Sequence, residues 1–324
     1  MSEPILEIKD LKKHFPTAAG PFSKSRGAVK AVDGVSLNVM PGETVGLVGE
    51  SGCGKTTVGR TVMKLYQPTS GQIFFDGEEI THVRGRAMKP IRSKLQMIFQ
   101  DPYSSLNPRH TVGQIVGSSF EIHGINPEGG IKVAVQELLE RVGLNPEHIN
   151  RFPHEFSGGQ RQRIGIARAL ALKPKLIVAD EPVSALDVSI QAQVVNLLDD
   201  LQKELGLSYL FVAHDLSVVQ HISDRVVAMY LGKVMEEAPT AELFAHPRHP
   251  YTKALLSAVP IPDPRIERSR ERITLKGDLP NPANPPSGCV FSTRCWKATE
   301  LCHQVAPEVV EITPRHKVAC HFPE

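Results

Sequence analysis

The first three-quarters of the chain alternates short apolar segments with longer segments of helical period. Residues 44–49, 175–180 and 208–215 are rich in Val, Ile, Leu and Phe, which predicts strands buried on both faces. Residues 188–205 carry apolar side chains every three or four positions, which predicts an amphipathic helix. Strands that alternate with helices favour βαβ units, so we expect an α/β fold with a mostly parallel sheet.

Two segments differ from this alternation. Residues 226–236 predict a pair of strands that turn at Gly232, which would give the sheet an antiparallel edge. Residues 100–157 hold few strand signals, and residues 131–142 form an amphipathic stretch. We therefore expect a helical subdomain, spanning about residues 100–165, inserted into the sheet domain.

Proline is concentrated at the end of the chain, where residues 236–324 hold 13 of the 26 prolines. Proline fixes φ and removes a backbone donor, so a regular core of strands and helices is not expected to continue there. The sequence thus predicts a first domain over residues 1–240 and a Pro-rich extension over residues 241–324.

Composition and charge exclude several classes of protein. Of 324 residues, 41% are hydrophobic, as in ordinary globular proteins. The 37 basic and 35 acidic side chains leave a net charge of +2, which gives no electrostatic reason to expect a nucleic-acid partner. No run approaches the roughly 18 apolar residues of a membrane span, and the first ten residues do not resemble a secretion signal. We expect the chain to stay in the cytoplasm.

The first chemical motif is a phosphate-binding loop of the form G-x-x-x-x-G-K-[ST]. It follows the apolar segment 44–49 and precedes a predicted helix over residues 57–66, which is the context such a loop requires. Its backbone N–H groups can surround phosphate oxygens, its lysine can reach the β- and γ-phosphates, and its threonine hydroxyl can hold Mg²⁺. The loop and the helix start comprise Gly49, Glu50, Ser51, Gly52, Cys53, Gly54, Lys55, Thr56 and Thr57.

Three polar groups follow the other two predicted strands. Asp180 ends one strand and Glu181 comes next, while His214 lies at the end of the other. In an open parallel sheet, ligands bind outside the carboxyl ends of the strands, so these groups should lie beside the phosphate loop. Asp180 suits Mg²⁺, and Glu181 could accept a proton from an attacking water.

A Ser-Gly-Gly-Gln segment precedes a long helical run. Such an exposed helix start can receive an anion, although the residues by themselves favour a plain N-cap at Ser157. The segment consists of Ser157, Gly158, Gly159 and Gln160.

Together, these motifs resemble the ATP-binding subunits of ABC transporters. The segment FSGGQ is similar to the family signature LSGGQ, with Phe156 in place of the usual leucine. Gln100 resembles the Q-loop glutamine, which links Mg²⁺ with the transporter, and residues 184–187, ending in Asp187, resemble the D-loop. His214 resembles the switch histidine on the γ-phosphate. The resemblance covers about residues 5–240 and implies a P-loop ABC ATPase core.

The resemblance also implies how the site works. Two such subunits sandwich two ATP molecules head to tail, so the signature of one meets the γ-phosphate held by the other. Phe15 lies where an aromatic side chain stacks on adenine. Glu181 is present where the family carries its catalytic carboxylate, which implies a hydrolytic site.

Three further stretches resemble the dipeptide and oligopeptide importers of this family. They are residues 101–116, 246–264 and 284–295, and the nearest match is the second ATPase subunit of dipeptide permeases. This implies ATP-driven uptake of short peptides at the cytoplasmic face of the membrane. The implied partners are a second homologous ATPase, two membrane-spanning permease subunits and, indirectly, an extracytoplasmic peptide-binding protein. The alternatives are the same role for nickel, haem or a glutathione-like solute, or a soluble ABC ATPase without a transport role.

Four of the five cysteines lie in the extension, with spacing C-x5-C-x6-C-x17-C. Disulfides are disfavoured in a reducing compartment, and four thiolates suit either an iron–sulfur cluster or tetrahedral zinc. The spacing does not choose between these and reduced, unligated thiols. The resemblance to the peptide importers implies a [4Fe–4S] cluster on Cys289, Cys295, Cys302 and Cys320.

Overall fold

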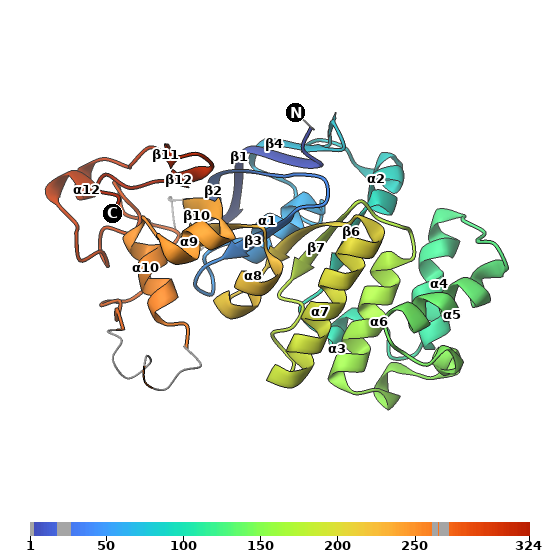
Figure 1. Ribbon diagram of the computed structural model, residues 1–324. Helices are drawn as coiled ribbons and strands as arrows, with labels where there is room; N and C mark the ends of the chain where they lie inside the picture. Colours follow the sequence, from blue (N-terminus) through green and yellow to red (C-terminus); the bar gives the residue numbers. More distant parts are fainter. Residues whose placement is uncertain (1–2, 18–26, 261–264, 266–271) are drawn as a thin grey trace.

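The computed structural model describes residues 3–17, 27–260, 265 and 272–324. The last four residues of the predicted importer stretch 246–264 thus lie outside the described residues. Figure 1 shows a sheet in the middle, a helical region on one side and the extension on the other. The strands are β1 (Leu6–Pro16), β2 (Ala28–Val39), β3 (Thr44–Val48), β4 (Ser70–Phe75), β5 (Glu78–Glu79), β6 (Leu95–Ile98), β7 (Leu176–Asp180), β8 (Ser208–Val212), β9 (Arg225–Tyr230), β10 (Lys233–Pro239), β11 (Val310–Thr313) and β12 (His316–Val318).

The helices include one of 18 residues, α7, which has the bounds expected from its apolar period. The α-helices are α1 (Lys55–Val62), α2 (Lys89–Lys94), α3 (Pro102–Ser105), α4 (Val112–His123), α5 (Gly130–Arg141), α6 (Gly158–Leu170), α7 (Val188–Leu205), α8 (Leu216–Ile222), α9 (Thr240–Ala245), α10 (Pro250–Ser257) and α12 (Glu300–Gln304). Short 3₁₀ turns cover Gly85–Met88, Pro146–Asn150 and Pro153–Glu155. None of the described helices is both long and apolar enough to cross a lipid bilayer.

The central sheet has eight strands in the order β11-β12-β10-β9-β3-β8-β7-β6. β9, β3, β8, β7 and β6 are parallel, whereas β10 and the strands beyond it are antiparallel. The predicted α/β class and antiparallel edge are therefore confirmed. The turn between β9 and β10 places Leu231 and Gly232 at positive φ, of 44° and 76°. β3, whose carboxyl end leads into the phosphate loop, lies between β9 and β8.

A second, antiparallel sheet with the order β2-β1-β4-β5 lies beside the central sheet. Its inward apolar side chains, such as Leu6, Ile8 and Leu11, share one hydrophobic cluster with residues of β3 and α1. Because side chains of α1 are buried in this same cluster, the helix packs against both sheets.

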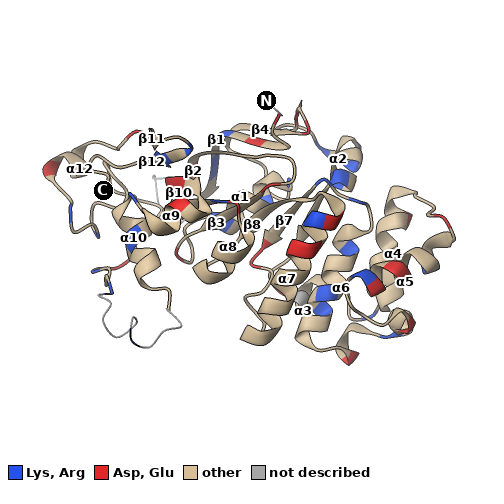
Figure 2. Cartoon of the chain, viewed as in Figure 1, with Lys and Arg blue, Asp and Glu red and all other residues tan. Residues whose placement is uncertain are grey.

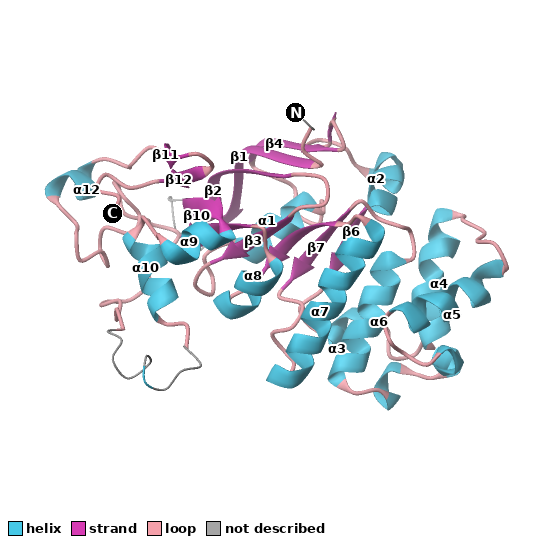
Figure 3. Cartoon of the chain, viewed as in Figure 1, coloured by secondary structure: helices cyan, strands magenta, loops and turns pink. Residues whose placement is uncertain are grey.

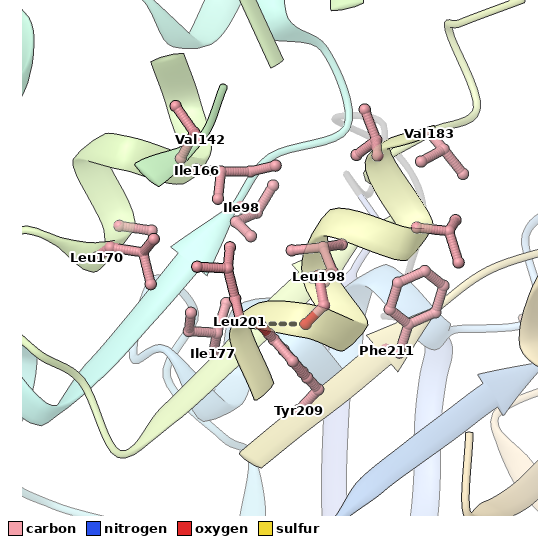
Figure 4. Close-up of a cluster of buried hydrophobic side chains, with 14 of the residues drawn as sticks. Ile98, Val142, Ile166, Leu170, Ile177, Val183, Leu198, Leu201, Tyr209 and Phe211 are labelled. Carbon is pink, nitrogen blue, oxygen red and sulfur yellow. Dashed lines mark hydrogen bonds between the residues drawn. The ribbon is translucent and has the colours of Figure 1, made fainter. Parts of the chain in front are cut away.

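The other face of the central sheet is covered by helices α6, α7 and α8 (Figure 1). Figure 4 shows part of their core, where Leu198 and Leu201 of α7 lie against Tyr209 and Phe211 of β8. The buried Tyr209 hydroxyl donates a hydrogen bond to the Leu198 carbonyl oxygen over 3.2 Å, so the polar group is satisfied within the core.

Two expectations from the sequence are corrected by the structure. The helix after the phosphate loop ends at Val62, because Lys64 takes a positive φ of 59°. In addition, regular structure does continue into the extension: β12 pairs with β10, matching Val318 with Glu236, and β11 adds a further strand. Figure 3 shows that loops nevertheless make up much of the described chain between residue 272 and β11.

Candidate functional site

The phosphate loop connects β3 to α1 through glycines at positive φ. Gly49, Gly52 and Gly54 have φ values of 147°, 80° and 108°. A Cβ on Gly54 would collide with the Ala31 carbonyl oxygen, so only glycine fits where β2 crosses the loop. The buried Lys55 ammonium lies inside the loop and donates to the carbonyl oxygens of Gly49 (2.8 Å) and Glu50 (3.1 Å). The loop is therefore wrapped around a single positive charge.

A hydroxyl and a carboxylate meet where α1 faces the end of β7. The Thr56 hydroxyl donates to Asp180 Oδ1 over 2.8 Å. Asp180 is fully buried, and burial raises the pKa of its carboxyl group. Its Oδ2 atom has no hydrogen-bond partner among the described residues and lies 3.7 Å from the Arg60 guanidinium. A buried carboxylate oxygen without a hydrogen bond is suited to a cation, so Thr56 and Asp180 fit a Mg²⁺ ion.

Glu181 follows directly and lies among the ends of three parallel strands. Its backbone takes a positive φ of 46°, and its N–H donates to the Val212 carbonyl oxygen over 2.9 Å. Its Oε2 atom accepts a hydrogen bond from Gln100 Nε2 over 2.9 Å and lies 3.3 Å from His214 Nδ1. A non-glycine residue at positive φ is strained, and such strain is typical of functional residues. The backbone at Glu181 therefore indicates that the orientation of its side chain is important.

The structure thus brings six of the predicted site residues into one place. Two of them, Gln100 and His214, are exposed, whereas Asp180 and Lys55 are buried. The site therefore has a buried floor that carries the charged groups and an open rim. The six residues are Lys55, Thr56, Gln100, Asp180, Glu181 and His214.

The Ser157 segment lies elsewhere, at the start of α6. Ser157 Oγ accepts the Gln160 N–H over 3.4 Å, while Gln160 Oε1 accepts the Ser157 N–H over 3.0 Å, which is a reciprocal capping box. Gly159 faces Ile190 of α7 so closely that a Cβ would collide with that side chain. In the part of the chain that the structure describes, no hydrogen bond links this segment to the phosphate loop.

The D-loop residues lie between Glu181 and α7. The Ser184 hydroxyl donates to the Glu181 carbonyl oxygen over 3.1 Å, so the D-loop is tied to the strand end. Asp187 is the exposed N-cap residue of α7, and its side chain makes no capping hydrogen bond. Gly158 of the signature segment lies near Leu186, which brings the two motifs together on one surface.

Phe15 lies near the end of β1, where it is half-buried. Its ring contacts Tyr66 edge to face, with 5.3 Å between centroids, and the Lys13 ammonium lies 4.8 Å from its centroid. An aromatic ring held in this way can offer its face to a nucleotide base.

The four late cysteines border one small cavity of about 20 Å³, together with Phe291 and His249. Burial raises the pKa of the Cys289 thiol to about 11 and also raises those of Cys295 and Cys320. Among the described residues, no group of three or more His, Cys, Asp or Glu side chains is arranged to hold a metal ion.

Three residues near the site were not predicted from the sequence. Arg60 lies four residues after Thr56 on α1, so helical spacing could have indicated it. Tyr251 and Arg294 contact the loop residue Glu50 from the extension. No local signal in the sequence points to those two contacts, because they join residues 201 and 244 positions apart.

Comparison with known families gives two matches in this chain. Residues 32–184 match the family described as ABC transporter, and residues 235–302 match the family described as oligopeptide/dipeptide transporter, C-terminal region. The first match contains the phosphate loop, Asp180 and Glu181, and the second contains three of the four late cysteines.

Individual proteins are similar over almost the whole chain. The oligopeptide transport ATP-binding protein AppF of Bacillus subtilis is 58% identical, covering 99% of this chain and 98% of its own length. The oligopeptide transport ATP-binding protein OppF of Salmonella typhimurium is 54% identical over 98% of this chain and 95% of its own length. Among solved structures, cbiO1 of Clostridium perfringens has a TM-score of 0.64 at 30% identity, covering 75% of this chain and 92% of its own. A dimeric ATP-binding cassette with bound ADP and phosphate also has a TM-score of 0.64, at 28% identity over 72% of this chain and 98% of its own.

Proposed function

Since this chain belongs to the ATP-binding subunits of ABC transporters, in the group with the oligopeptide/dipeptide C-terminal region, we propose that it hydrolyses ATP to energise import of dipeptides and short oligopeptides. The observation that carries the chemistry is the position of Glu181, which Gln100 and His214 flank beside the Thr56–Asp180 pair.

The positions of the site residues support a separate role in hydrolysis for each of them. The loop N–H groups and Lys55 bind the β- and γ-phosphates, while Thr56 and Asp180 would hold Mg²⁺. When bound, the ion neutralises charge on the phosphate oxygens. Glu181 accepts a proton from the water that attacks the γ-phosphorus, and His214 orients the γ-phosphate from the open rim. As the new oxygen–phosphorus bond forms, the bond between the γ-phosphorus and the oxygen bridging to the β-phosphorus breaks, and ADP and inorganic phosphate leave.

The site requires a second ATPase subunit in this proposal. Among the described residues, Ser157–Gln160 make no hydrogen bond to their own phosphate loop, and Ser157 and Asp187 are both exposed, with Gly158 near Leu186 between them. They would close over ATP held by a partner, and the family resemblance favours a homologous chain over a second copy. We propose no role for nucleic acid: Figure 2 shows basic and acidic residues interspersed over the elements.

The transport partners follow from the family. Two membrane-spanning permease subunits would hold the chain at the cytoplasmic face of the membrane, and a peptide-binding protein would deliver the solute from outside. We also propose that the chain divides at about residue 240, with the ATPase domain before it, the helical subdomain over about residues 100–165, and the importer extension after it. Nickel, haem or a glutathione-like molecule is the alternative solute.

We further propose that the four late cysteines bind a [4Fe–4S] cluster. Their shared position around one cavity supports this, and as thiolates the four sulfurs would be the ligands of the iron atoms. Anaerobic purification followed by iron, sulfide and zinc analysis tests it. Iron with equal sulfide supports the cluster, zinc alone points to a structural zinc site, and neither would mean reduced thiols.

The main test uses the chain assembled with its permease subunits and binding protein in proteoliposomes. Wild type should hydrolyse ATP faster when transported peptides are added. Glu181→Gln should bind ATP yet lose turnover by about a thousandfold, because the proton acceptor is gone. Lys55→Ala should instead lose ATP binding.

The outcomes separate the parts of this function. Turnover at the wild-type rate in Glu181→Gln would refute the assignment of the base. Hydrolysis that is indifferent to peptides, but stimulated by another solute and its binding protein, would keep the ATPase and replace the substrate.

A further inference from the structure

The phosphate loop is held by two residues of the extension. The Glu50 backbone N–H donates to the Tyr251 hydroxyl oxygen over 2.8 Å. The Arg294 guanidinium donates through Nη1 to Glu50 Oε2 over 2.6 Å. Both the backbone and the side chain of one loop residue are thus fixed from outside the ATPase core.

The Glu50–Arg294 ion pair is partly buried and adjoins the phosphate-binding loop. The Glu50 side chain is 28% exposed and the Arg294 side chain 10% exposed, so solvent screens the pair only in part. Glu50 is also a carboxylate within a loop that binds a triphosphate. Without a counter-charge it would repel the nucleotide, because like charges at close range disfavour binding.

The arginine has a rigid support. Its backbone N–H donates to the Phe291 carbonyl oxygen over 3.0 Å, and its Nη1 atom lies 3.5 Å from the Tyr230 hydroxyl. The rings of Tyr230, Tyr251 and Phe291 are fully buried, with centroids 4.9 to 5.4 Å apart. Arg294 and the Tyr251 hydroxyl are therefore presented to Glu50 by one aromatic cluster.

We propose that Arg294 is a positioning residue for ATP binding, which neutralises Glu50 and keeps the loop open to the phosphates. Tyr251 assists by holding the Glu50 backbone. The proposal rests on the proposed ATPase function and assigns a role in it to the extension. Under this proposal, the affinity for ATP depends on the contact between Glu50 and Arg294, which are 244 positions apart in the sequence.

The experiment is a double-mutant cycle on the full chain. ATP affinity is measured by titration, and KM and kcat are measured on the assembled transporter, for wild type, Arg294→Gln, Glu50→Gln and the double variant. Arg315→Gln is the matched control, since it removes the same charge from the extension at a position that is 69% exposed. Thermal unfolding of each variant reports whether the chain is folded.

Arg294→Gln should weaken ATP binding by about tenfold and raise KM with little change in kcat, the effect of one unpaired, partly screened charge. Glu50→Gln should bind ATP more tightly than wild type, because the Arg294 charge beside the triphosphate is then uncompensated. The double variant should recover to within about threefold of wild type, because the repulsive carboxylate is gone as well. Arg315→Gln should have no effect.

Several results would overturn this role. A double variant as weak as Arg294→Gln would show that charge neutralisation is not the cause, and unchanged affinity in Arg294→Gln would remove the role altogether. If Arg294→Gln does not fold, Arg294→Lys replaces it: Lys keeps the charge and should stay within about threefold of wild type, and a full tenfold loss would refute the proposal. Failure of the proposed function looks different, because the wild-type chain itself would then not bind ATP.

Discussion

The strand-end site and the extension are held together in different ways. The site groups lie at or after the carboxyl ends of β3, β6, β7 and β8, and the parallel sheet brings those ends to one edge. The extension has few regular elements, and its Tyr251 and Phe291 pack in a small cluster against Tyr230 of β9. The first arrangement is fixed by the backbone of a large core, whereas the second depends on a handful of side chains.

The two regions therefore respond differently to the loss of one buried side chain. Loss of one side chain in the large core leaves many others, but loss of one ring in the extension removes a large part of its buried apolar area. The extension contacts the site through Glu50, so damage to it should reach nucleotide binding.

Phe291→Ala should give the largest effect on stability. Its ring is fully buried against two tyrosines and borders the cysteine cavity, so the substitution should cost about 3–5 kcal/mol of the free energy of unfolding for the extension. Chemical denaturation with limited proteolysis checks it, and cleavage within the extension should precede loss of the ATPase core.

The matched control for this prediction is Trp296→Ala. Trp296 is a large aromatic residue in the same loop but is 48% exposed, so its loss should be nearly neutral. Equal destabilisation by both substitutions would show that the aromatic cluster is not what stabilises the extension.

The sequence predicted that Asp180, Glu181 and His214 would lie beside the phosphate loop, because the information for these positions is local. The spacing of the phosphate loop, the apolar run before Asp180 and the helical period over residues 188–205 are each contained in one short segment. It did not predict that β12 would pair with β10 or that Arg294 would meet Glu50. Those contacts join residues that are far apart, and no periodicity encodes them.

Ser157→Ala should have an intermediate effect. The serine caps α6, so its loss should cost about 1 kcal/mol of stability, measured by urea denaturation. If the same hydroxyl also closes the site of a partner subunit, ATP hydrolysis by the assembled transporter should fall by about tenfold or more, beyond what the lost stability explains.

Thr111→Ala separates these two roles. Thr111 caps α4 with the same reciprocal capping box, and its substitution should cost similar stability. Its effect on hydrolysis should be small. A comparable loss of hydrolysis in both variants would mean that Ser157 acts only as a cap.

Asp76→Asn should have the smallest effect on stability. It removes an ion pair within the ATPase core, which can be compared with the Glu50–Arg294 pair. Asp76 follows β4 and accepts hydrogen bonds from Lys175 (2.8 Å) and Lys94 (2.9 Å), which lower the pKa of its carboxyl group below 3.8. Both lysine side chains are about half exposed, so solvent screening should limit the loss at pH 7 to below about 1 kcal/mol. Asparagine tolerates the positive φ of 53° at this position, so the substitution changes charge without straining the backbone.

The pH dependence identifies the cause of that loss. A carboxyl group with a lowered pKa in the folded state stabilises the fold above its unfolded pKa, and this contribution disappears as the pH falls through the folded value. The difference between wild type and Asp76→Asn should therefore be constant from pH 8 to about 5 and shrink below about 4. Asp10→Asn, at a similar positive φ but paired with Lys12 over 3.4 Å in an exposed position, should cost almost no stability at pH 7. A difference for Asp76→Asn that persists unchanged in acid would show that the aspartate does not act through its charge.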